Sequence, residues 1–190
     1  MKAHRHHRAH GRSRWFGRAI GSPVRGIVHD PLHILFSEVR AGDQCLDLGC
    51  GGGFFTLPLA RLVGSSGRVV AADIQPEMLE GVRRRADAAG LLDRIEPRLI
   101  GADGIGDVAA FDFVLAFWML HEVPDQARTL SQLRRALKPG GRVLLAEPAG
   151  RVGEAAFARS VEMARDAGLR PIRAARISAS RAVVLACDEE

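Results

Sequence analysis

A glycine-rich loop directly after a short apolar segment constrains this chain more than any other feature. The loop reads Gly49-Cys50-Gly51-Gly52-Gly53, follows the apolar segment 44–48 and leads into a helix-like apolar stretch at 54–63. Glycine permits backbone angles, and a close approach of a ligand, that a Cβ atom would prevent. In an open α/β sheet, a loop of this kind between the first strand and the first helix is the usual nucleotide position. We therefore predict a ligand-binding turn at the start of an α/β domain.

Apolar strands and amphipathic helices alternate along the chain, which predicts a parallel sheet with helices on both faces. Strands are expected at 44–48, 68–73, 95–100, 111–117, 142–147, 171–177 and 181–186, and helices at 31–39, 54–63, 76–89, 126–137 and 154–167. Only Ser178-Ala179-Ser180 separates the last two strands. A parallel crossover needs a dozen or more residues, so this pair must be antiparallel. The predicted fold is a Rossmann-like, seven-stranded, mostly parallel sheet with an antiparallel last strand.

Charge divides the chain into two unequal parts. Residues 1–29 contain seven Lys or Arg and no acid, so the net charge of +5 leaves −2 for residues 30–190. We expect residues 1–22 to form a basic, flexible N-terminal arm and residues 23–190 to form one domain. A nearly neutral body disfavours nucleic acid as its partner. The histidines of the arm fit solvated tail residues better than metal ligands, so no metal is expected.

The apolar runs are too short to cross a bilayer, and no signal-peptide core follows the basic N-terminus. Three widely spaced cysteines, Cys45, Cys50 and Cys187, form neither a disulfide framework nor a zinc spacing. We therefore expect a cytoplasmic protein with reduced thiols and no membrane span. The oligomeric state is open, with a homodimer among the forms that the sequence permits.

Acidic residues follow the next two strands at positions that suit a nucleoside. Asp73 ends the second strand, 20 residues after Gly53, where a carboxylate can accept hydrogen bonds from two ribose hydroxyls. Asp103 follows the third strand, where it can accept a hydrogen bond from an exocyclic adenine amine. Each also fits a structural role, as a helix cap or a turn residue. Phe54 stands where a dinucleotide fingerprint needs its third glycine, so NAD is disfavoured.

Five short motifs follow one another with regular spacing over residues 31–187. They are Leu46-Asp47-Leu48-Gly49-Cys50-Gly51-Gly52-Gly53, Val70-Ala71-Ala72-Asp73, Gly101-Ala102-Asp103, Phe111-Asp112 and Leu137-Lys138-Pro139-Gly140-Gly141. Together they resemble a class I S-adenosylmethionine-dependent methyltransferase, and the reversed last strand is a further point of likeness. The resemblance implies S-adenosyl-L-methionine as the cofactor and methyl transfer as the activity.

The resemblance also implies which residues contact the cofactor: Asp47, Gly49, Gly51, Gly53, Asp73, Ile74, Ala102, Asp103 and Phe117. Asp47 and the loop amides would hold the methionine part, and Asp73 would hold the ribose. Asp103, with its neighbour Ala102, would bind the adenine amine. Ile74 would lie against the adenine face, and Phe117 would approach the sulfonium.

The segment 117–124, after the fourth strand, supplies the candidate for catalysis. Methyl transfer from a sulfonium needs alignment and exclusion of water, and it needs a base only where the acceptor must lose a proton. His121 is the candidate base or acceptor contact, because an imidazole titrates near neutrality. It fits equally well as a helix cap or as packing under the cofactor, while Glu122 can orient it or face solvent. Trp118 and Met119 fit either an apolar acceptor pocket or the core.

The same segment resembles the small-molecule branch of the family, which includes quinone-methylating enzymes. Residues 117–120 lack the Asn/Asp-Pro-Pro-aromatic motif of adenine-amine methylation, and a Pro-Cys nucleophile for cytosine is also missing. We therefore expect a small-molecule acceptor, which the sequence does not identify. The alternatives are an RNA or protein methyltransferase guided by the basic arm and a non-catalytic cofactor-binding scaffold. The arm can also be a lid over the acceptor.

Overall fold

The computed structural model describes residues 29–101, 104–105 and 110–187. The helices are α3 (Pro31–Leu35), α4 (Thr56–Leu62), α5 (Pro76–Ala88), α6 (Gln126–Ala136) and α7 (Glu154–Asp166), with 3-10 turns η1 (Leu92–Arg94) and η2 (Leu120–Glu122). The strands are β1 (Gln44–Leu48), β2 (Arg68–Asp73), β3 (Ile95–Leu99), β4 (Phe111–Phe117), β5 (Leu137–Pro148), β6 (Arg170–Ala175) and β7 (Ser180–Ala186). The predicted arm, residues 1–22, lies outside the described residues, as do Ala102 and Asp103.

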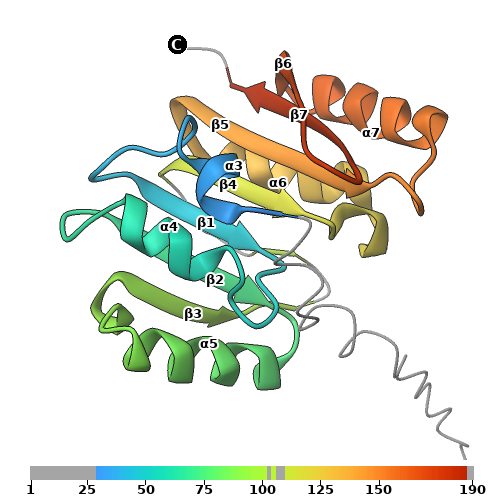
Figure 1. The fold of residues 1–190 in the computed structure, drawn as a ribbon. Helices are drawn as coiled ribbons and strands as arrows, with labels where there is room; N and C mark the ends of the chain where they lie inside the picture. The colour runs from blue at the N-terminus through green and yellow to red at the C-terminus, as the bar shows by residue number, and fades with distance from the viewer. Residues whose placement is uncertain (1–28, 102–103, 106–109, 188–190) are drawn as a thin grey trace, which may run out of the picture.

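The strands form one seven-stranded sheet in the order β3-β2-β1-β4-β5-β7-β6 (Figure 1). Strands β1 to β5 pair in parallel, whereas β7 runs antiparallel to both of its neighbours, β5 and β6. The sheet therefore confirms the predicted fold, including the reversed last strand. The reversal follows from the short link between β6 and β7, which leaves no room for a parallel crossover.

Each face of the sheet carries its own hydrophobic core. Helices α3, α4 and α5 cover one face, and α6 and α7 cover the other (Figure 1). The central strand β4 shows the division, because Phe113, Leu115 and Phe117 enter the first core and Val114 and Ala116 the second. Side chains of a strand point to alternate faces, so a strand covered on both faces must be apolar throughout.

The strand order reverses between β1 and β4, the neighbouring pair at the middle of the sheet. The chain runs from β1 outward to β2 and β3, and from β4 outward to β5. The loops that leave the carboxyl ends of β1 and β4 therefore diverge and open a crevice at this edge. Ligands of open α/β sheets bind in such a crevice.

The motif residues 138–141, which precede the strand expected at 142–147, lie within β5 as a bulge. Phe111 pairs with Leu137 and Phe113 with Arg142, so the single residue Asp112 faces four residues of β5. The Lys138 ammonium reaches back to Asp112 at 2.6 Å. Strand β5 therefore begins at Leu137, earlier than expected, and its regular pairing with β4 resumes at Arg142, after the bulge.

The helices differ from expectation mainly at their ends. The predicted helix at 31–39 ends at Leu35, because the amides of Glu38 and Val39 both donate to the Leu35 carbonyl in a tight turn. Val39 is still buried, as its apolar character predicts. The longest helices, α5 and α7, have 13 residues each. In the described ranges no helix has the length and apolar character needed to span a membrane.

Candidate functional site

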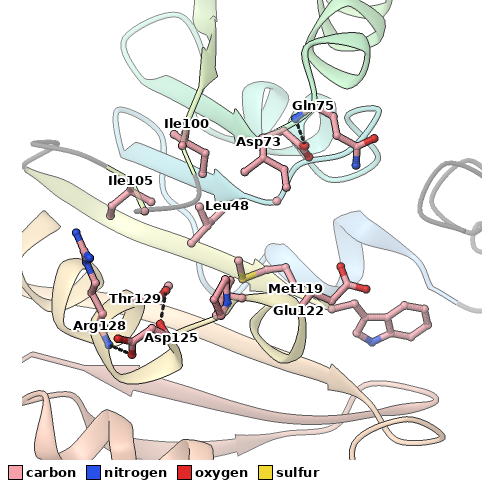
Figure 2. Close-up of a pocket in the computed structure, with 17 residues that line it drawn as sticks. Leu48, Asp73, Gln75, Ile100, Ile105, Met119, Glu122, Asp125, Arg128 and Thr129 are labelled. Carbon is pink, nitrogen blue, oxygen red and sulfur yellow. Dashed lines mark hydrogen bonds between the residues drawn. The ribbon is translucent and has the colours of Figure 1, made fainter. Parts of the chain in front are cut away.

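A cavity of about 260 Å³ opens at the carboxyl edge of the sheet, in the crevice beside β1 and β4. We call it the main cavity. Its walls come from the loops after β1, β2, β3 and β4 and from the start of α6. Figure 2 shows Asp73, Gln75 and Ile100 on one side and Asp125, Arg128 and Thr129 on the other. Most of the surface that its lining exposes is apolar, so the cavity suits a ligand with a large apolar surface.

The glycine loop borders the main cavity through Gly49. Gly49, Gly51 and Gly53 all adopt positive φ angles, of 71°, 51° and 88°. A Cβ atom on Gly49 would lie 2.9 Å from the Cβ of Met119, another residue of the cavity wall. Residue 49 is therefore restricted to glycine by its backbone angle and by this close approach. The loop amides at 49 and 50 donate to the Ala72 carbonyl, which ties the loop to the end of β2.

Asp73 brings a buried carboxylate to the wall of the main cavity. The residue is only 6% exposed, yet it lines the cavity. One carboxylate oxygen accepts a hydrogen bond from the Gly51 amide and the other from the Gln75 amide, both at 2.9 Å. Each oxygen retains capacity for a further hydrogen bond. The carboxylate is thus held rigidly, with acceptor positions that suit a diol, and its predicted contact with ribose stays a prediction.

Asp47 and Phe117, two other predicted cofactor contacts, are buried and do not line the main cavity. Asp47 accepts a hydrogen bond of 2.6 Å from the hydroxyl of Thr56, the first residue of α4. Phe117 packs in an aromatic cluster with His29, Phe55 and Trp118, at centroid distances of 4.5 to 5.5 Å. Both residues support the walls around the site, and their contact with a cofactor remains a prediction.

Trp118 forms part of the cavity wall in a strained backbone conformation. Its φ of 58° lies in the left-handed region, which costs a non-glycine residue about 1–2 kcal/mol. The amide donates to the Ala146 carbonyl at 2.8 Å, and the indole Nε1 donates to the Ser180 hydroxyl at 3.0 Å. The ring also lies edge-on to His29. Trp118 and its neighbour Met119 line the cavity and also pack against the two cores, so a contact with the acceptor stays a prediction.

His121 does not line the main cavity; its ring faces a second cavity of about 250 Å³. The Nδ1 atom of the ring pairs with the Glu147 carboxylate, which is 1% exposed and also accepts a 2.9 Å hydrogen bond from the Leu120 amide. Glu147 was not singled out in the sequence. Its signal there is an acid that follows the apolar run 143–146 of a buried strand. The catalytic role predicted for His121 stays a prediction.

Glu122 lies between the two cavities. The residue lines the main cavity, and its Oε1 atom is 3.4 Å from the Nε2 atom of His121 and 3.3 Å from a guanidinium nitrogen of Arg151. Burial raises the pKa of Glu122 above its ordinary value, and the nearby charges of His121 and Arg151 oppose that rise. A carboxylate with a raised pKa is a stronger base than an exposed one.

None of the three cysteines lines the main cavity. Cys45, Cys50 and Cys187 are buried and unpaired, as expected. Burial raises the pKa of both Cys45 and Cys50, which keeps these thiols protonated and unreactive. Across residues 29–101, 104–105 and 110–187, no group of three or more His, Cys, Asp or Glu side chains is arranged to hold a metal.

The fold and the main cavity define a class I, Rossmann-like methyltransferase. The family described as methyltransferase domain matches residues 45–141, which is half of the chain. The chain therefore belongs to this family. A solved S-adenosylmethionine-dependent methyltransferase from Aquifex aeolicus superposes with a TM-score of 0.77 at 25% identity, covering 87% of this chain and 93% of that one. The resemblance predicted from the five motifs is confirmed, and the cofactor of the class is S-adenosylmethionine.

Two relatives carry quinone-biosynthesis names. The ubiquinone/menaquinone biosynthesis C-methyltransferase UbiE of Cronobacter sakazakii is 38% identical over 112 residues, and the demethylmenaquinone methyltransferase of Symbiobacterium thermophilum is 40% identical over the same length. Each match covers 58% of this chain and 45% of the relative. The match thus spans less than half of these relatives. The likeness to quinone-methylating enzymes is confirmed, while the acceptor of this chain is unidentified.

Proposed function

We propose that this protein transfers a methyl group from S-adenosylmethionine to an apolar small molecule in the main cavity. The observation that carries the proposal is the pairing of the buried Asp73 carboxylate with the glycine loop across one wall of that cavity. Family membership and the Aquifex aeolicus structure support the same reading.

The residues present fit the cofactor. Gly49 leaves the space at the loop that a Cβ atom would fill, and Asp73 offers two fixed acceptor oxygens for a ribose diol. Ile74 is 60% exposed at the cavity wall and presents an apolar face for adenine. Asp47, Gly51, Gly53 and Phe117 would support this cradle from the loop and from the end of β4. When bound, the cofactor supplies a methyl group that is already activated by the positive sulfur.

The lining of the cavity supports an apolar acceptor. Trp118, Met119 and Val123 all contribute apolar side chains to its lining. The near-neutral body of the chain gives little attraction for a polyanion such as RNA. Because the two curated relatives are named for quinone substrates, a reduced naphthoquinone is our first choice of probe. A cytoplasmic location and a homodimer remain part of the proposal, and a mass of twice 20.5 kDa in light scattering would support the dimer.

Calorimetry with the full chain tests the cofactor. We expect S-adenosylmethionine to bind and NAD to give no heat, and binding of NAD without S-adenosylmethionine would overturn the proposal. Transfer of labelled methyl groups is then measured with 1,4-naphthohydroquinone, catechol and transfer RNA as acceptors. Label in a small molecule supports the proposed function, whereas label only in RNA favours the alternative guided by the basic arm. Cofactor binding without transfer to any of many acceptors would instead favour the scaffold.

A further inference from the structure

Three side chains form an unbroken line from the main cavity to the second one. Glu122 lines the main cavity, His121 lies behind it, and Glu147 lines the second cavity with His121. The Glu122 carboxylate is 3.4 Å from Nε2 of the His121 ring, and Nδ1 of the same ring pairs with the Glu147 carboxylate. An imidazole between two carboxylates can take a proton at one nitrogen and release one from the other.

On the basis of the proposed function, we propose that Glu122 takes the proton that the methyl acceptor loses, and that His121 and Glu147 conduct it to the second cavity. Glu122 is then the catalytic residue, because it alone of the three lines the main cavity. His121 and Glu147 are positioning residues, which act on the acceptor only through Glu122.

The geometry favours Glu122 over His121 as the group that meets the acceptor. Nδ1 of His121 is engaged by Glu147, and its Nε2 is buried, without a hydrogen-bond partner within the described part of the chain. This nitrogen lies 3.4 Å from Oε1 of Glu122. The Glu122 side chain is 25% exposed, so its carboxylate can reach a ligand in the cavity while it remains beside the imidazole.

The proton balance of the step requires such a base. A nucleophilic atom of the acceptor forms a bond to the methyl carbon, and the carbon–sulfur bond breaks with its electron pair remaining on sulfur. The acceptor now carries one proton too many, and that proton passes to an oxygen of Glu122. Glu122 then passes this proton to Nε2 of His121, and the ring releases its Nδ1 proton to Glu147. The proton on Glu147 leaves through the second cavity. No oxidant or reductant is needed.

The charged groups around Glu122 set the pH range of the step. Burial and the charges of Glu147 and Asp73 raise the pKa of Glu122, while His121 and Arg151 oppose the rise. Arg151 is two-thirds exposed at the rim, where solvent screens its effect. A base must be ionised, so turnover is expected to fall as the pH drops through the pKa of Glu122. This fall should lie above the ordinary value of 4.5.

The first test compares Glu122→Gln with a matched control, Glu154→Gln, an exposed acid at the start of α7. With S-adenosylmethionine and 1,4-naphthohydroquinone, we expect Glu122→Gln to lower kcat about 100-fold and to abolish the acidic fall in the pH profile. Cofactor affinity in calorimetry should be unchanged, and Glu154→Gln should match the unmodified chain throughout. A Glu122→Gln enzyme with full turnover and the original pH profile would overturn the proton path.

The second test needs no acceptor. The full chain is labelled with 15N-histidine, and His121→Gln identifies the ring signals of His121. We expect Glu122→Gln to move the Nε2 resonance and Glu147→Gln to move the Nδ1 resonance, while Glu154→Gln moves neither. Ring signals that ignore both substitutions would overturn the path whether or not an acceptor is known. Failure of the proposed function is seen separately, as absence of S-adenosylmethionine binding by the unmodified chain.

Discussion

Asp73 and Glu147 are two buried carboxylates at equivalent places in the sheet. Asp73 ends β2, which flanks β1, and Glu147 lies near the end of β5, which flanks β4. Both carboxylate oxygens of Asp73 accept hydrogen bonds from backbone amides. In Glu147, one carboxylate oxygen accepts a hydrogen bond from the Leu120 amide, and the other pairs with the His121 ring. The two halves of the sheet thus end in the same chemical group with different partners.

The partners determine what each carboxylate can do. The two backbone amides hold the oxygens of Asp73 in place, which suits the proposed binding of a neutral diol. An imidazole has two nitrogens that can each bind or release a proton, so Glu147 contacts a group that can pass a proton on. A carboxylate at the end of a parallel strand can therefore serve binding or proton transfer, according to the group placed against it.

Removal of Asp73 should give the largest effect. Asp73→Ala removes the acceptors of two buried amides and those offered to the ribose, and hydrogen bonds to a charged group contribute about 1.5–3 kcal/mol each. We therefore expect the affinity for S-adenosylmethionine to fall about 100-fold in calorimetry. Asp87→Ala, an exposed acid of α5, is the control and should bind normally. Normal binding by Asp73→Ala would remove this residue from the cofactor site.

Glu147→Gln should lower stability without changing cofactor affinity, unlike a substitution of Asp73. The amide oxygen can still accept from the Leu120 amide, but the charge beside His121 is lost. We expect the free energy of unfolding in urea to fall by about 2 kcal/mol, the contribution of a hydrogen bond to a charged group. S-adenosylmethionine should bind with unchanged affinity, in contrast to the Asp73 variant. A large loss of S-adenosylmethionine affinity in this variant would show that Glu147, like Asp73, contributes to cofactor binding.

Ser180→Ala should give the smallest effect. It deletes the hydroxyl that accepts the indole hydrogen bond of Trp118, and a neutral hydrogen bond contributes about 1 kcal/mol to stability. Thermal melting should detect this loss, while Ser65→Ala, at an exposed position, should melt like the unmodified chain. Because Trp118 lies on the cavity wall, we also expect the KM for 1,4-naphthohydroquinone to rise with little change in kcat. An unaltered KM would indicate that Ser180 does not hold the wall.

The sequence was sufficient for the fold because its signals are local. Apolar periodicity located every strand of the sheet, and the short link at 178–180 determined the reversal of β7. The end of α3 and the bulge at 138–141 were not foreseen, because hydrogen bonds in a turn and pairing with β4 decide them. Neither leaves a periodic pattern in the chain.

The residues of the site were likewise predictable from the sequence only in part. Asp73 and the glycine loop were recognisable because motif and spacing identify them, and both meet at the main cavity. The pairing of His121 with Glu147 joins residues 26 positions apart on different elements. Only tertiary structure reveals it, and so the sequence favoured His121 as the base and left Glu122 as its possible helper.

The reversal of β7 has a consequence for how the enzyme can diversify. Antiparallel pairing sets Ser180, the first residue of β7, opposite Pro148 at the far end of β5, and so delivers its hydroxyl to Trp118. The proposed cofactor contacts come from the loops after β1 and β2, on the other side of the main cavity. If the proposed function holds, changes in the C-terminal hairpin would remodel the acceptor side while the cofactor side stays intact, so acceptor choice could evolve separately from cofactor binding.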